Sequence, residues 1–319
     1  MDLFTHLLVG AVMYTSVFGN ITIEFLFIAL LFAVLPDFDI ILTPLRRWIK
    51  SDYMEHRGGS HSYLIGMLIS ILVNLVYAPV TGKNFFLGWL IGSIFYALHI
   101  SLDLLTTTKI PVLYPISKKE LSFYSEKAGS LFTMIISIGF LAIIIPIYSV
   151  GNFQLFKYVS YGITIFFLIY YLYRIFLKLK ISKKLKSNQK YLPGILPFYY
   201  LIYESELSEN HIAVKLYKNS LLTKRLPIVN FETFFSDNEY KLYQEALKMC
   251  NEDYYRNKWT KFPIINRENN HFSIKFYFLE TMMNGRTMNL LYNYDFGKER
   301  YEELVQSYGR IGKEKKNKD

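Results

Sequence analysis

Residues 84–106 read NFFLGWLIGSIFYALHISLDLLT, an almost wholly apolar stretch with one histidine and one aspartate near its end. A helix that crosses the ~30 Å hydrocarbon core of a bilayer needs about 20 predominantly apolar residues. The stretch has that length, so it predicts a membrane-spanning helix. His99 and Asp103 stand four positions apart, which places both side chains on one face of that helix.

Other apolar stretches lie on both sides of this one along the chain. Together they predict helices at residues 3–18, 21–36, 63–80, 84–106, 130–149 and 153–177. The first two are short for a full crossing, so they would have to thin the bilayer or lie partly at its edge. We therefore expect an all-α polytopic membrane domain over residues 1–180, with about six transmembrane helices. A small soluble α+β domain should follow at 181–311, and residues 312–319 should form a disordered Lys-rich tail.

Composition and charge favour the same division. The 52% hydrophobic and 18% aromatic content exceeds the usual soluble range. The net charge is +10, but seven Lys or Arg lie between Arg174 and Lys190, a pattern typical of a juxtamembrane topology signal rather than a nucleic-acid site. With six spans, the positive-inside rule puts both termini in the cytoplasm of a protein of the cell membrane. The single cysteine, Cys250, excludes an intrachain disulfide and a Cys-rich zinc module.

Two acidic motifs follow or end predicted helices. Pro36 marks the end of the second helix, and Asp37 and Asp39 come directly after it. Outside helical geometry such a pair can reach one metal ion or bridge two, although solvated acids at a helix end are an equally ordinary interpretation. Asp103 is costly in an apolar segment without a partner, and a helix-tying hydrogen bond to His99 is the alternative to shared metal ligation.

A short loop adds two more imidazoles. Residues 56–62 read HRGGSHS, in which two glycines allow a tight turn that presents His56 and His61 inward. Arg57 suits bidentate contact with a phosphate or with one of the carboxylates. The alternative is a solvated basic loop that happens to contain histidine.

The predicted topology brings seven candidate ligands to one membrane face. They are His6, Asp37, Asp39, His56, His61, His99 and Asp103. Imidazole and carboxylate ligands without thiolate suit Zn²⁺ best, with Mn²⁺ or Fe²⁺ as alternatives. Seven ligands exceed the need of one tetrahedral zinc, so we expect two ions about 3.5–4 Å apart. Such ions convert water to hydroxide and stabilise a phosphoryl oxygen, which makes Asp37, Arg57 and His61 candidate catalytic residues.

The ordered set of motifs resembles the YdjM-type family of membrane-bound metal-dependent hydrolases. The resemblance rests on Thr5–Gly10, Leu35–Asp39, His56–Ser62, His99–Thr106 and Pro111–Pro115, and it covers about residues 1–180. It implies a helical membrane domain, a metal site built from the matched histidines and aspartates, and hydrolase activity. It also implies a distant similarity to the zinc phospholipase C and P1 nuclease group, which favours a phosphoester substrate. Glu55 and Thr107 depart from the family pattern, where glycine and proline are common, but neither departure removes a ligand.

The expected function is therefore an integral membrane hydrolase. It would cleave a phosphoester with a metal-bound hydroxide at the cytoplasmic interface, where membrane lipids are partners and a lipid is a candidate substrate. A membrane structural or binding protein with a structural metal site is the alternative. A transporter is less favoured, because the candidate ligands lie at one membrane face rather than at the midplane.

Beyond the basic stretch, the apolar pattern changes to short alternating runs. These predict strands at residues 198–203, 211–217, 271–278 and 288–294, and helices at residues 239–250 and 298–307. His211 and His271 fall in strand-like runs without acidic neighbours at ligand spacing, so we expect them to be structural. The many aromatic residues are expected to form a core, and no nucleic-acid partner is expected.

Overall fold

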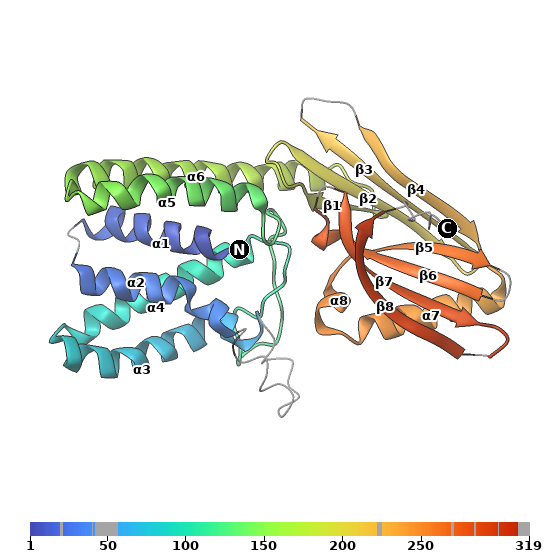
Figure 1. Cartoon of the computed structure of the whole chain (residues 1–319), viewed down its shortest axis with the longest axis horizontal. Helices are drawn as coiled ribbons and strands as arrows, with labels where there is room; N and C mark the ends of the chain where they lie inside the picture. Colours follow the sequence, from blue (N-terminus) through green and yellow to red (C-terminus); the bar gives the residue numbers. More distant parts are fainter. Residues whose placement is uncertain are drawn as a thin grey trace, which may run out of the picture. The chain divides into compact units, whose positions relative to one another are not determined.

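The chain forms two compact units, Met1–Lys178 and Leu179–Asp319. The structure is a computed structural model that describes residues 1–19, 22–39, 41, 57–221, 225–268, 271–283, 285–298 and 300–311 (Figure 1). The first unit is helical and the second is mainly β-sheet (Figure 1). The predicted tail at 312–319 lies outside the described residues.

The helical unit is a bundle whose helices have these bounds: α1 (Leu3–Phe18), α2 (Ile23–Val34), α3 (Tyr63–Thr81), α4 (Phe85–Leu104), α5 (Leu131–Ser149) and α6 (Phe153–Ser182). Within the described residues, four of them, α3 to α6, are long and apolar enough to cross a membrane. The chain therefore carries the features of a multi-pass membrane protein.

The expectation of six spans is wrong for the first two helices. α1 has 16 residues and α2 has 12. At about 1.5 Å per residue these helices are about 24 and 18 Å long, shorter than a ~30 Å hydrocarbon core. Gly19 ends α1 in a backbone conformation with a φ of 67°, and Pro36 lies just beyond α2. Since the predicted orientation of the termini assumed six spans, it stays a prediction.

Helices α3 and α4 pack closely through small residues. The buried face of α3 consists of Gly66, Ser70, Asn74 and Ala78, each four positions from the next. A Cβ atom at Gly88 of α4 would collide with Asn74, and one at Gly92 would collide with Ser70. Small residues at such spacing are what allow helices to approach in a membrane, where apolar burial gives no net drive to associate.

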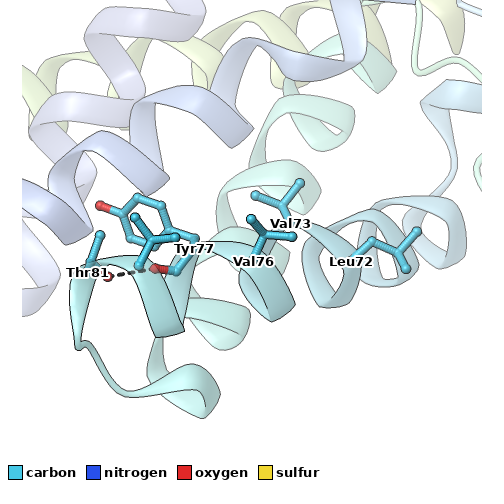
Figure 2. A pocket seen from close by; sticks show the side chains of 6 residues that line it. Leu72, Val73, Val76, Tyr77 and Thr81 are labelled. Atoms are coloured by element: carbon cyan, nitrogen blue, oxygen red, sulfur yellow. Dashed lines mark hydrogen bonds between the residues drawn. The ribbon is translucent and has the colours of Figure 1, made fainter.

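The opposite face of α3 is apolar and exposed. Leu72, Val76 and Val80 are 64%, 68% and 79% exposed. With Val73, Tyr77 and Thr81 they line a shallow hollow, shown in Figure 2. On a helix long enough to span a bilayer, such a surface is the one that lipid tails cover.

A buried ion pair joins α6 to the segment before α5. Arg174 Nε lies 2.9 Å from Glu126 Oε2, both side chains are fully buried, and Tyr170 donates its hydroxyl to the same carboxylate at 2.6 Å. Arg174 is the first residue of the basic stretch at 174–190, and its side chain is buried. Arg174 lies within α6, and its buried guanidinium needs an acidic partner.

The second unit contains two four-stranded antiparallel sheets. Their strand orders are β1-β2-β3-β4 and β5-β6-β7-β8. The first sheet comprises β1 (Gln189–Pro193), β2 (Tyr199–Ser208), β3 (His211–Ser220) and β4 (Leu226–Phe234). The second comprises β5 (Lys261–Glu268), β6 (His271–Phe278), β7 (Arg286–Asp295) and β8 (Arg300–Arg310), and helices α7 (Asp237–Asn251) and α8 (Tyr254–Lys258) connect the two.

Most of the predicted elements of this unit are present. The strands predicted near β2, β3, β6 and β7 and the helix near α7 are confirmed. The helix predicted at residues 298–307 is wrong, because the residues from Arg300 onward form strand β8, paired with β7. Tyr301 lies opposite Tyr294, and their rings are 5.1 Å apart. Pairing across the hairpin overrides a weak helical propensity here.

Candidate metal centre

Four candidate ligands of the helical unit gather where α2 ends, α3 begins and α4 ends. Asp37 lies in the tight turn that follows α2, which Pro36 separates from regular helix. His61 ends a short 3-10 turn, Gly59–His61, that leads into α3. His99 and Asp103 occupy the last turns of α4 and share its buried face.

Four side chains converge closely enough to hold one cation. Asp37, His61, His99 and Asp103 each offer one ligand atom, and these atoms all lie within 4.8 Å of one another. His61 Nε2 is 3.2 Å from Asp103 Oδ2, and Asp37 Oδ1 is 3.7 Å from the Nε2 atoms of both His61 and His99. Separations of this size fit ligands that share an ion at about 2.0–2.2 Å each.

His6 of α1 borders this group. Its ring stacks on that of His99 with centroids 3.7 Å apart. Its Nε2 lies 3.4 Å from Asp103 Oδ1 and 4.0 Å from Asp37 Oδ2. His6 is therefore placed as a fifth candidate ligand, on the side of the cluster that α1 covers.

Asp39 contacts the cluster through His61 rather than joining it. Its Oδ2 accepts hydrogen bonds from the Ser60 hydroxyl at 2.5 Å and from the Arg57 backbone N–H at 2.9 Å. The same atom is 3.4 Å from His61 Nδ1, the ring nitrogen on the far side from the cluster. Asp39 thus fixes the orientation of an imidazole whose Nε2 faces the other ligands. His56, the remaining predicted ligand, lies outside the described residues.

The His99 ring is oriented in a similar way. Its Nδ1 lies 2.7 Å from the backbone carbonyl oxygen of Ala33 in α2. A carbonyl only accepts hydrogen bonds, so Nδ1 carries the proton and the lone pair of Nε2 points into the cluster. This is the arrangement that a metal-binding imidazole requires.

Arg57 is directed at a carboxylate of the cluster. Its Nε lies 3.2 Å from Asp103 Oδ2, and its terminal nitrogens donate to the Met1 carbonyl at 3.1 Å and to Thr108 Oγ1 at 3.0 Å. The Met1 amino group also contacts Asp103 Oδ1. Of the two contacts that the sequence left open for Arg57, the structure shows the one with a carboxylate.

Several polar atoms of the cluster are buried without a hydrogen bond. Within the described residues, these include Asp37 Oδ1 and both ring nitrogens of His6. Burial by itself would raise the pKa of the Asp37 carboxyl, but the neighbouring His61 and His99 rings hold that pKa below its ordinary value. Buried polar atoms are costly unless they find a partner, and a divalent cation would provide one. The donor set therefore fits a bound metal ion.

Ser60 and the Ala33 carbonyl are the contributors that sequence reasoning did not single out. Ser60 stands inside the HRGGSHS motif, so its place beside His61 could be read from the sequence. The Ala33 carbonyl carries no sequence signal, because every residue has one. Its role depends only on how α2 packs against α4.

Comparison with known proteins gives a family match for the helical unit. The chain matches no curated protein and no solved structure. The model of one family, described as YdjM inner membrane protein, matches residues 1–181, which include all of the described cluster. The match extends over more than half of the chain, which therefore belongs to the YdjM inner membrane protein family.

Proposed function

We propose that the helical unit is a metal-dependent hydrolase that cleaves a phosphoester at the membrane interface. The observation that carries the proposal is the convergence of Asp37, His61, His99 and Asp103, whose ligand atoms lie within 4.8 Å of one another. The set holds imidazoles and carboxylates without thiolate, which suits Zn²⁺, Mn²⁺ or Fe²⁺. With His6 alongside, we propose room for a second ion.

The chemistry of such an ion is general. A divalent ion held by these residues would lower the pKa of a water molecule and stabilise negative charge on a phosphoryl oxygen. The protein's own part is to keep the ligands aligned. Asp39 and Ser60 hold His61, the Ala33 carbonyl holds His99, and Arg57 holds Asp103.

Exposure indicates where water and substrate would enter. The side chains of His61, His99 and Asp103 are fully buried, whereas that of Asp37 is 17% exposed. We assign the entrance to the Asp37 side, where its carboxylate would orient an incoming water molecule by accepting a hydrogen bond. A buried, pre-aligned set of charges is what lowers the barrier for developing charge in a transition state.

The test combines metal analysis with hydrolysis assays on the full-length protein in lipid nanodiscs. Wild-type protein should retain divalent ions and hydrolyse at least one member of a panel of phosphodiesters, phospholipids and lysolipids. His61→Ala and Asp103→Ala should lose both properties. His211→Ala is the matched control, because that histidine lies in the other unit, 2.9 Å from Glu232.

A structural metal site is the second candidate. It is favoured by the fact that the ligands come from separate elements, so one ion would join the ends of α2, α3 and α4. Metal retained by wild-type protein without hydrolysis of any panel member would support this candidate over the enzyme. Absence of bound metal would contradict both. Transport is a third hypothesis, which a measured flux across the membrane of proteoliposomes would support.

A further inference from the structure

The segment 105–130, which joins α4 to α5, exposes several large apolar side chains. We propose that it lies in the headgroup layer of the bilayer. Leu113, Ile116 and Phe123 would contact lipid chains, and Lys109 and Lys119 would bind anionic phosphate headgroups. The proposal does not depend on hydrolase activity, because it concerns how the end of the bundle that carries the candidate metal centre meets the membrane.

The backbone of this segment is held in place. Ile110 and Leu121 exchange two backbone hydrogen bonds of 2.9 Å. Val112 O accepts from the N–H of Tyr63 at the start of α3 at 3.0 Å, and Leu104 O accepts from the Phe123 N–H at 2.7 Å. The segment is therefore anchored to α3 and α4, and the side chains it turns outward are presented by a fixed backbone.

Its apolar side chains divide into an inner and an outer set. Ile110 and Val112 are 0% and 4% exposed and pack in the core of the bundle. Leu113, Ile116 and Phe123 are 49%, 81% and 50% exposed. An outer set of large apolar side chains on an ordered backbone marks a contact surface.

The neighbouring helices identify the occupant of this surface. α4 and α5 are both long and apolar enough to span a bilayer, so the segment begins where one leaves the membrane and ends where the other enters it. Figure 1 shows the segment running across one end of the helical unit. Lys109 and Lys119 are exposed along it. Apolar side chains interspersed with lysine at a membrane boundary match the chemistry of anionic lipid headgroups and the first part of their acyl chains.

The experiment places a nitroxide label at Ile116→Cys in full-length protein reconstituted into vesicles. Cys250 is buried, so the native thiol does not compete for the label. Collision with oxygen, which enters lipid, and with a water-soluble nickel complex gives the depth of the label. We expect the label at position 116 to lie about 5–10 Å into the boundary region between the headgroups and the acyl chains.

Two labelled controls make the result decisive. Leu72→Cys on the outer face of α3 should report lipid and thus confirm insertion of the bundle, while Asn210→Cys in the β-sheet unit should report water. A label at position 116 that is as accessible to nickel as the one at Asn210 would overturn the proposal. A label shielded from both reagents would also overturn it, in favour of a protein partner or a second copy of the chain.

The lysines are tested with spin-labelled lipids. Lys109→Gln with Lys119→Gln should lower the preference for phosphatidylglycerol over phosphatidylcholine by about fivefold per lysine. Lys241→Gln, an exposed lysine of α7, is the matched control and should leave this preference unchanged. Equal preference in the double variant and the wild type would contradict the headgroup contact.

Discussion

Each unit buries acidic side chains, but their surroundings differ. In the β-sheet unit, the Glu280 carboxylate accepts bonds from Thr260 N and Thr260 Oγ1 at 2.7 Å and lies 3.4 Å from Lys190 Nζ. In the helical unit, Asp37 Oδ1 is buried without any hydrogen bond among the described residues, and its neighbours are other side chains that could bind a metal ion. A buried acid with complete partners stabilises a fold, whereas a cluster of buried acids and imidazoles with unmet bonding capacity is suited to binding a cation.

The histidines follow the same contrast. His211 of β3 is partly exposed and lies 2.9 Å from Glu232 of β4. His6, His61 and His99 are fully buried and face one another and two aspartates. An exposed pair of this kind contributes little to stability. The histidines of chemical interest are therefore those of the helical unit.

The largest expected effect is that of metal on the two units. A chelator should lower the free energy of unfolding of the helical unit by about 3–4 kcal/mol relative to protein with metal at 100–1,000 times its Kd, because the ion binds only the folded state. The β-sheet unit should not respond. Hydrogen exchange of backbone amides in α4 and β6 would measure both. Equal hydrogen-exchange protection of α4 with and without metal would show that the two units do not differ in their response to metal.

Substitution of the satisfied acid should give the opposite pattern. Glu280→Gln removes a charged acceptor of two hydrogen bonds and is expected to destabilise the β-sheet unit by about 2–3 kcal/mol. Metal content should stay at the wild-type value. Exchange rates of β6 amides and elemental analysis would show this, and a variant that lost metal would refute the separation of the two clusters.

A smaller effect is expected for the residue that orients His61. Asp39→Asn should weaken metal affinity 10–100-fold, or about 1.4–2.7 kcal/mol, since supporting hydrogen bonds align a ligand without bonding the ion. Competition with a chelating dye measures it. Glu24→Gln serves as the control, because the Glu24 carboxylate pairs with Lys83, outside the cluster. A loss as complete as that of Asp103→Ala would instead make Asp39 a direct ligand.

The smallest effect is predicted for the exposed histidine. His211→Ala should change the free energy of unfolding of the β-sheet unit by less than about 1 kcal/mol, because water screens its interaction with Glu232. Thermal unfolding followed by circular dichroism would test this. A loss of several kcal/mol would show that exposure is a poor guide to the role of histidines in this chain.

The identities of the elements were largely readable in the sequence. Long apolar runs predicted α3 to α6, and alternating runs predicted β2, β3, β6 and β7. These patterns are local, since a helix satisfies its own backbone and a strand alternates its faces. The sequence was misleading where pairing decided the outcome, as in β8, which adopts strand structure because β7 lies beside it.

The candidate site divides along the same line. The sequence alone determined which residues were available as ligands, because only histidines and aspartates at helix ends suit a metal site of this kind. Only the tertiary structure decided their roles: Asp37, His61, His99 and Asp103 converge, Asp39 holds His61, and Arg57 holds Asp103. The physical reason is that a polar group's role depends on which partner lies within about 3 Å, and that distance is set by the packing of segments far apart in the chain.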